Sequence, residues 1–284
     1  MEKNNFISVL NFNTHEITAN LISQLIERVS SHCVINILDN SLQSDGLINA
    51  INALTILSEN GFQRPLVFSD HDIVWKGFIN FNDYSVKICI YHIGKNLGFA
   101  AGHNFLLGKC IQSMNKSDGF FILNNDIKLD SDLIGELSLS LDVCNESILS
   151  PVILKSDGSV WFNGAVYSKV RGCAYHDTSL YPDQGTREIK SLNGCVLAMS
   201  GELARMLNPI FDERFFVYGE DTDLSKKAKL LGIKLTIVQS IYVKHFVSAS
   251  SKNRQAINFY TNAIRILLIR KWERNPLYIF LFII

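Results

Sequence analysis

Phe120-Phe121-Ile122-Leu123-Asn124-Asn125-Asp126 is an apolar run that stops abruptly at two amides and a carboxylate. The run predicts a buried strand with Asp126 just beyond its carboxyl end. In open α/β sheets this edge is where ligands bind, and a carboxylate two residues after an amide suits a hard cation that carries phosphate oxygens. A strand followed by an Asx-type turn would give the same residues, so this stretch alone leaves both interpretations open.

Upstream of this stretch, strands and helices alternate. Residues 6–12 and 33–38 read as strands, and an amphipathic helix ending near Ser30 lies between them. A strand–helix–strand unit of this length implies parallel strands, so Asp39 should share an edge with Asp126. A strand over 86–91 then leads into a glycine-rich turn at 94–104. The pattern predicts an α/β fold with a Rossmann-like, mostly parallel central sheet flanked by helices.

Two segments lack a clear pattern. We expect loops with aromatic anchors over 61–84, apart from a short strand at 66–68, and polar loops over 168–190 that cover the site. Between and beyond them the sequence predicts strands at 148–154, 159–162 and 192–199, and a helix that starts at Asp130–Asp132. A last helix over 253–272 is expected to follow a strand at 234–238 and the segment 243–246.

The bulk composition narrows the class of protein. The chain has 284 residues, 47% of them hydrophobic, and a formal net charge of zero. A neutral chain argues against nucleic acid as a partner, because phosphate backbones require a basic surface. The six cysteines show no metal-clip spacing and read as reduced thiols, and we expect neither a signal peptide nor a membrane-spanning segment. These features predict a cytoplasmic protein.

The segment Phe211-Asp212-Glu213-Arg214-Phe215-Phe216-Val217-Tyr218-Gly219-Glu220-Asp221-Thr222-Asp223-Leu224 places three acids at the start of a helix. Acids in a first turn favour the helix dipole, which would explain them structurally. The aromatic residues before them would also desolvate a carboxylate and tune it as a base. His245, between apolar residues, fits a buried core histidine or a ligand.

Taken together, these motifs resemble those of inverting family 2 glycosyltransferases with the glycosyltransferase A fold. The most similar members are bacterial rhamnosyltransferase-like enzymes that build surface polysaccharides. The resemblance runs from Ile7 to about Trp272 and rests on the order of five pieces. They are residues 9–13, 38–41, 96–102, 123–126 and 211–224. It implies a catalytic domain over 1–252, with a nucleotide-binding half at 1–130 and an acceptor-binding half at 131–252, followed by a C-terminal helix and apolar tail at 253–284.

The resemblance also implies roles for particular residues. Asp221 would be the general base, with Glu220 beside it as the second catalytic acid. Asp126 and His245 would hold Mg2+ or Mn2+. The nucleotide-sugar contacts would come from residues at the strand ends and turns, namely Asn11, Asp39, Asn96, Gly98, Asn124, Asn125 and Gly194.

One position departs from the family pattern. The family's metal-binding Asp-X-Asp element has Asn124 in place of its first acid. An amide is a weaker ligand than a carboxylate, which predicts a lower affinity for the metal.

The implied reaction moves a sugar from a UDP- or dTDP-sugar to a hydroxyl of a glycan or lipid-linked acceptor, with inversion, in polysaccharide or O-antigen synthesis. One alternative is a catalytically degenerate binding subunit, which Asn124 alone favours. Another is a nucleotidyltransferase, but residues 11–16 lack the basic glycine-rich loop that such enzymes usually need.

The C-terminal residues suggest contact with a membrane. The basic residues Arg265, Arg270, Lys271 and Arg274 precede an apolar tail from Leu277. A basic helix with an apolar end can lie in the membrane interface, which would place the protein at the inner face of the cytoplasmic membrane. A helix packed on the domain, with its tail in a groove or on a partner, explains the same residues.

Overall fold

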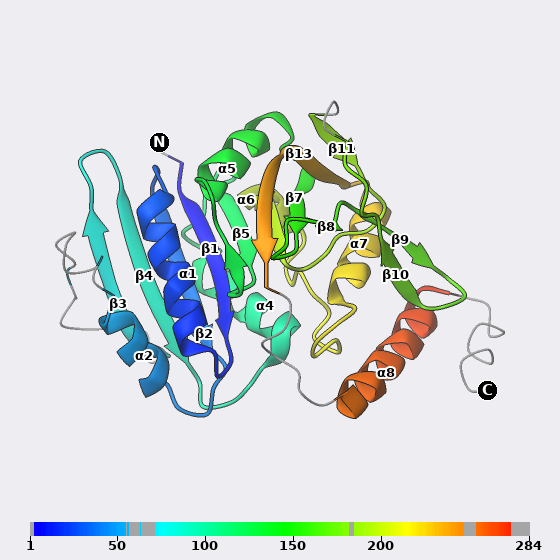
Figure 1. Ribbon diagram of the computed structural model, residues 1–284, viewed down its shortest axis with the longest axis horizontal. Helices are drawn as coiled ribbons and strands as arrows, with labels where there is room; N and C mark the ends of the chain where they lie inside the picture. The colour runs from blue at the N-terminus through cyan, green and yellow to red at the C-terminus, as the bar shows by residue number, and fades with distance from the viewer. Residues whose placement is uncertain are drawn as a thin grey trace.

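The computed structural model describes residues 3–54, 56, 63, 72–181, 185–246 and 254–273, with side chains in the last range from residue 261 on. One mixed sheet runs through the molecule (Figure 1). Its strands are β1 (Asn5–Asn11), β2 (Cys33–Asp39), β3 (Ile73–Asn80), β4 (Ser85–His92), β5 (Gly119–Leu123), β6 (Ile127–Lys128), β7 (Ser147–Leu154), β8 (Val160–Phe162), β11 (Thr186–Glu188), β12 (Val196–Ser200) and β13 (Lys234–His245). A separate hairpin consists of β9 (Ala165–Ser168) and β10 (Cys173–His176). The helices are α1 (His15–Arg28), α2 (Asp45–Asn52), α4 (Gly98–Cys110), α5 (Leu133–Val143), α6 (Gly201–Met206), α7 (Glu220–Leu230) and α8 (Arg254–Trp272).

The order of the strands reverses direction at β1. Along the sheet the order is β11-β13-β7-β12-β5-β1-β2-β4-β3, and β4, β2, β1 and β5 are parallel. The chain moves outward from β1 to β2 and β4, then returns to pair β5 on the other side of β1. This reversal is a topological switch point, and ligands bind beyond the carboxyl ends of the strands that flank it. Asn11 ends β1 there, and Asn124 follows β5.

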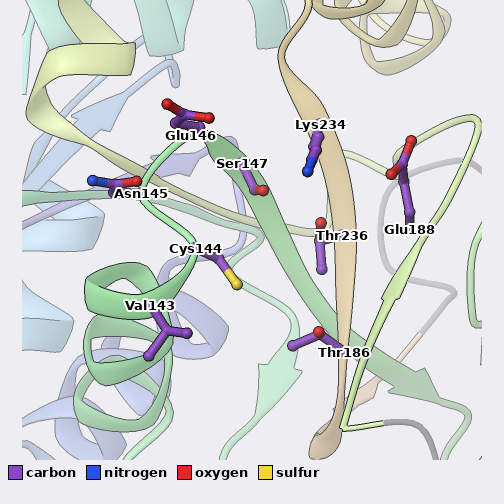
Figure 2. Close-up of a pocket in the computed structure, with 9 residues that line it drawn as sticks. All are labelled: Val143, Cys144, Asn145, Glu146, Ser147, Thr186, Glu188, Lys234 and Thr236. Carbon is purple, nitrogen blue, oxygen red and sulfur yellow. The ribbon is translucent and has the colours of Figure 1, made fainter.

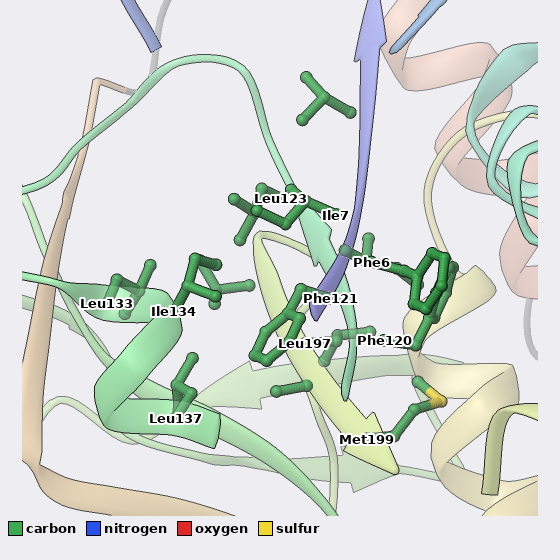
Figure 3. Packing of buried hydrophobic residues seen from close by; sticks show 14 of the residues in the cluster. Phe6, Ile7, Phe120, Phe121, Leu123, Leu133, Ile134, Leu137, Leu197 and Met199 are labelled. Carbon is green, nitrogen blue, oxygen red and sulfur yellow. The ribbon is translucent and has the colours of Figure 1, made fainter. Parts of the chain in front are cut away.

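Strand β5 lies at the centre of the core. Every one of its residues is buried, and Phe121 and Leu123 lie among Ile7 of β1, Leu197 of β12 and Leu137 of α5 (Figure 3). A strand with neighbours on both edges and helices on its faces must be apolar throughout, which is why its sequence shows no alternation.

Helices pack on both faces of the parallel strands. Gly102 of α4 lies against Leu10 and Leu38, and a methyl group there would overlap their side chains. Because side chains alternate along a strand, the neighbouring Val9 and Ile37 point to the opposite face, which α1 and α2 cover (Figure 1). The predicted α/β fold with a mostly parallel central sheet flanked by helices is confirmed.

The structure corrects the prediction of loops at three places, one of which is β11, where residues 186–188 pair with β13. Residues 73–80 form β3, an antiparallel edge strand on β4, and residues 165–176 form the β9–β10 hairpin. The strands of the hairpin are short, and β3 is only partly buried on one face. The alternation of apolar and polar residues that marks a strand in sequence is therefore weak in both. The sequence also predicts a helix from Asp45 through Leu57, and of these residues Asp45–Asn52 form α2. The predicted strand at 66–68 and the apolar tail lie outside the described residues.

The helices that the structure describes include none that is both long and apolar enough to cross a membrane.

Candidate active site

The predicted metal ligands lie next to each other. Strand β13 pairs antiparallel with β6, and this register sets His245 opposite Ile127, one residue beyond Asp126. The Nε2 atom of His245 lies 3.0 Å from Oδ1 of Asp126 and 3.5 Å from Nδ2 of Asn124. The backbone N–H of Phe246 donates to the carbonyl of Asp126 at 3.0 Å, which holds the two chain segments together.

These residues fit a divalent cation that is shared with a phosphate ligand. Within the described part of the chain, no cluster of three or more His, Cys, Asp or Glu residues could hold a metal on its own. A carboxylate and an imidazole leave the other coordination positions open, as Mg2+ sites that bind substrate phosphates do. The buried Nδ1 of His245 has no hydrogen-bond partner among the described residues, so only Nε2 is engaged.

The ends of β1 and β2 are joined by a buried polar network. Asn11 donates to Oδ1 of Asp39 at 2.8 Å, and the same oxygen accepts from the backbone N–H of Ser41 at 3.0 Å. The other oxygen of Asp39, Oδ2, is buried and has no partner in the described residues. A buried carboxylate oxygen needs a donor. The N–H of a nucleobase is such a donor, and this role for Asp39 stays a prediction.

Asn125 connects this network to the metal ligands. Its amide donates to Thr14 at 2.7 Å and to Thr18 at 2.8 Å, and Thr18 donates to Asn11. The structure therefore shows Asn125 holding α1 against the end of β5. A direct contact between Asn125 and the donor stays a prediction.

The glycine-rich turn joins the two halves of the site. Asn96 accepts from the backbone N–H of Gly98 at 2.8 Å, and Gly98 has a φ of +73°, which favours glycine. A side chain at Gly98 would also collide with the carbonyl of Phe216. That carbonyl accepts from the backbone N–H of Phe99 at 2.7 Å. The turn at 96–99 therefore packs directly on the loop that carries the acid pair.

Glu220 and Asp221 begin α7 and differ in their surroundings. Asp221 accepts from the backbone N–H of Thr222 at 2.6 Å and from that of Gly194 at 3.3 Å. Glu220 is 6% exposed, and its Oε2 has no partner in the part of the chain that is described. The residue after Gly194, Cys195, accepts at its carbonyl from the backbone N–H of Asn124. The backbone at 194–195 therefore contacts both Asp221 and the segment that carries the predicted metal ligand Asp126.

The two carboxyl groups titrate differently because of these surroundings. Burial raises the pKa of Glu220 well above its usual value, and the adjacent Asp221 raises it further. Burial also raises the pKa of Asp221, but hydrogen bonds from Thr222 and Gly194 and the nearby His176 oppose the rise. When two interacting acids differ in this way, the shared proton resides on the less solvated one. These directions favour the ionised form of Asp221 over that of Glu220, and the role of Asp221 as general base stays a prediction.

Trp161 and His176 complete the site, and sequence reasoning did not assign them to it. The centroid of the Trp161 ring lies 4.9 Å from the centroid of the His245 ring and 4.9 Å from that of the His176 ring. His176 in turn lies near Asp221, and burial lowers its pKa against the opposing effects of that carboxylate and of the Trp161 carbonyl. Nothing in the spacing of these residues marks them, because β8 and the β9–β10 hairpin place them only in three dimensions.

By sequence, the chain matches no protein-family model and no curated protein. In three dimensions it is similar to GalNAc-T7 with UDP, GalNAc and Mn2+, with a TM-score of 0.61 and 12% identity over 94% of this chain and 48% of that one. It is also similar to S. aureus TarS 1–349 in complex with UDP, with a TM-score of 0.53 and 14% identity over 93% of this chain and 65% of that one. The chain thus spans about half of the first neighbour and just under two thirds of the second.

The chain has the glycosyltransferase A fold. The resemblance found in the motifs and the likeness in three dimensions agree on this fold, although the identities are too low to carry over a substrate.

In this glycosyltransferase A fold the third acid of α7, Asp223, acts as a brace. Its buried carboxylate accepts from Lys271 at 2.9 Å and from the Trp272 indole at 2.7 Å, so it fixes α8 beside α7. Lys271 also reaches Asp212 at 2.7 Å, and Ile264 packs against Gly219. Helix α8 therefore holds both ends of the loop that leads to the acid pair.

We expect Asp223→Asn to act through stability. The variant weakens charged hydrogen bonds to Lys271 and Trp272, which should lower the free energy of unfolding by about 1–3 kcal/mol. Turnover per folded molecule should stay near wild type, because Asp223 faces α8. Urea unfolding and an activity assay well below the melting temperature would measure both, with Lys229→Gln on the exposed face of α7 as control. A large loss of turnover at unchanged stability would contradict this role.

A separate hollow of about 260 Å3 lies near the amino ends of β7 and β13, away from the strand ends that carry the candidate site. Its walls come from the end of α5 and from β7, β11 and β13, and Glu146, Glu188 and Lys234 are at its rim (Figure 2). Ser147 and Lys234 begin their strands, whereas Asp126 and His245 lie at strand ends. The hollow is therefore distinct from the candidate active site.

Proposed function

We propose that the protein is an inverting, metal-dependent glycosyltransferase of family 2 that transfers a sugar from a nucleotide-diphosphate donor to a hydroxyl of a glycan or lipid-linked acceptor. The observation that carries the proposal is the pairing of Asp126 with His245 beside the acid pair at the switch-point edge. The glycosyltransferase A fold supports it, and so do the two neighbours with UDP.

The residues divide the chemistry between them. Asp126 and His245 would hold Mg2+ or Mn2+, which as a Lewis acid neutralises the charge on the leaving diphosphate. Asp221 accepts the proton of the acceptor hydroxyl as its oxygen bonds to the anomeric carbon. The bond from that carbon to the diphosphate oxygen breaks, and the diphosphate leaves with the electron pair. A single in-line displacement of this kind inverts the anomeric centre.

Calorimetry with UDP, dTDP and GDP, each with and without Mn2+, tests the donor site. Metal-dependent binding of one diphosphate is expected, and UDP and dTDP are favoured. An assay of donor hydrolysis then separates an enzyme from a degenerate binding subunit, which would bind the diphosphate without turnover. A chain that binds no diphosphate in the presence of Mn2+ would overturn the proposed function.

We further propose that the acceptor is part of bacterial surface polysaccharide or O-antigen synthesis and that residues after α8 contact the membrane. Flotation with anionic liposomes would compare the full chain with one that ends at Glu273. This end point keeps the contact of 3.0 Å between Glu273 and Lys226, so the helix stays anchored. The full chain should float and the shortened chain should not. Equal flotation of the two would remove the membrane contact from the proposal.

A further inference from the structure

Glu220 is a buried acid with an unused oxygen. Its side chain is more than nine-tenths buried, and Oε2 has no hydrogen-bond partner among the described residues. Buried polar atoms are nearly always bonded, because an unpaired one loses its solvation without compensation. The general base is already assigned to Asp221, so the reaction as described leaves Glu220 without a role.

Glu220 and Asp221 both lie beside Gly194, and each has a further neighbour of its own. Asp221 accepts from Gly194 and lies near His176 of the hairpin, in the acceptor-binding half. Oε1 of Glu220 lies 3.8 Å from the position that a Cβ on Gly194 would occupy, and the ring of Phe99 lies 3.1 Å from the same position. Phe99 belongs to the first turn of α4, which follows the parallel strands. Glu220 therefore lies close to the first turn of α4, which belongs to the half that we propose binds the donor.

The charges around Glu220 favour its neutral form. Within the described part of the chain, the charged group that acts on it is Asp221, which raises the pKa of Glu220 in the same direction as burial. Desolvation lowers the pKa of His176, on the hairpin side, which disfavours its charged form. Phe99, which packs from α4, brings no charge. A neutral carboxyl group has an O–H to donate, which an ionised one lacks.

We propose that Glu220 recognises the transferred sugar by donating a hydrogen bond from its carboxyl group to a sugar oxygen of the donor. This inference rests on the proposed function. The substrate class follows from it: a nucleotide-diphosphate sugar with a hydroxyl at the position that Glu220 reaches. A deoxy analogue that lacks this hydroxyl is rejected, because the buried carboxyl is then left unpaired.

Calorimetry of wild type, Glu220→Gln and Glu220→Ala in the presence of Mn2+ tests the inference. The probes are UDP, UDP-glucose, UDP-N-acetylglucosamine, dTDP and dTDP-rhamnose. Glu220→Ala should weaken binding of the preferred nucleotide sugar by about tenfold and leave its parent diphosphate within about twofold. Glu220→Gln should keep both affinities within about threefold, because its amide N–H can donate in place of the carboxyl O–H. Unchanged diphosphate binding also shows that each variant is folded.

The possible contrary results have different meanings. If Glu220→Gln loses as much affinity for the nucleotide sugar as Glu220→Ala, the ionised carboxylate is required and the inference is wrong. If Glu220→Ala weakens diphosphate and nucleotide sugar equally, Glu220 acts on the site as a whole, which also overturns it. If wild type binds none of these probes and no GDP, the proposed function itself fails and the inference fails with it.

Discussion

Asp221→Asn should lower turnover by roughly a hundred-fold to ten-thousand-fold, the usual effect of removing a general base. The N–H groups of Thr222 and Gly194 bond different oxygens of Asp221, so asparagine keeps the size of the side chain and an oxygen for one of them, but it cannot accept a proton. Affinity for the nucleotide sugar should change little, because the base acts on the acceptor. Steady-state kinetics with the donor identified by calorimetry, together with binding measurements, would separate the two effects.

The dependence of turnover on pH provides a second test of the role of the Asp221 carboxyl group. Burial raises the pKa of Asp221, so in wild type turnover should rise with pH through a value above that of an ordinary aspartate. Below that pKa the carboxyl is protonated and cannot act as a base. Glu220→Gln is the matched control and should keep most of its turnover. Near-normal turnover in Asp221→Asn with an inactive Glu220→Gln would move the base to Glu220, and normal turnover in both would rule out the mechanism.

Asp126→Ala should abolish most of the metal-dependent part of diphosphate binding, a loss of about ten-fold to a hundred-fold in affinity. Asp126 supplies the carboxylate of the pair with His245, and Asn124 alone cannot replace it because a neutral amide binds a hard cation more weakly. Calorimetry of UDP with and without Mn2+ measures the difference directly. Binding without the metal should be nearly the same in the variant and in wild type.

Asp130→Ala is a suitable control for this experiment. Asp130 lies four residues further along the chain, is exposed and pairs with Lys244 at 2.9 Å. Its removal changes the net charge by the same amount but leaves the pair of Asp126 and His245 intact. An Asp126→Ala variant that kept full metal-dependent binding, or an Asp130→Ala variant that lost it, would show that the cation binds elsewhere.

The central part of the fold was predictable because its signals are local. The apolar run at 120–123 predicted β5, and the strand–helix–strand spacing before it predicted the parallel pair of β1 and β2. The same spacing predicted that Asp39 and Asp126 share an edge of the sheet, and the structure places both at strand ends there. Edge strand β3 was missed because its less buried positions include Val74 and Phe78 and its buried positions include Gly77, so apolar and polar residues do not alternate in the sequence.

The candidate site was only partly predictable. His245 could be connected to Asp126 through the family resemblance, but their contact depends on the register of β13 against β6, which local sequence does not specify. Trp161 and His176 depend on how β8 and the β9–β10 hairpin fold back over the site. The sequence also does not predict the different environments of Glu220 and Asp221. These environments depend on contacts with Gly194 and Phe99, which lie far away in the sequence.

The bracing of Asp223 by α8 also has a consequence for the order in which the protein matures. Helix α8 follows all the other described elements, so a ribosome releases it after they have emerged, and domains generally begin to fold from their N-terminal part during synthesis. Until Lys271 and Trp272 have been made, the carboxylate of Asp223 lacks the cation and the indole that hold it in the finished structure. The loop before Glu220 is therefore fixed against α8 only after Lys271 and Trp272 have been made.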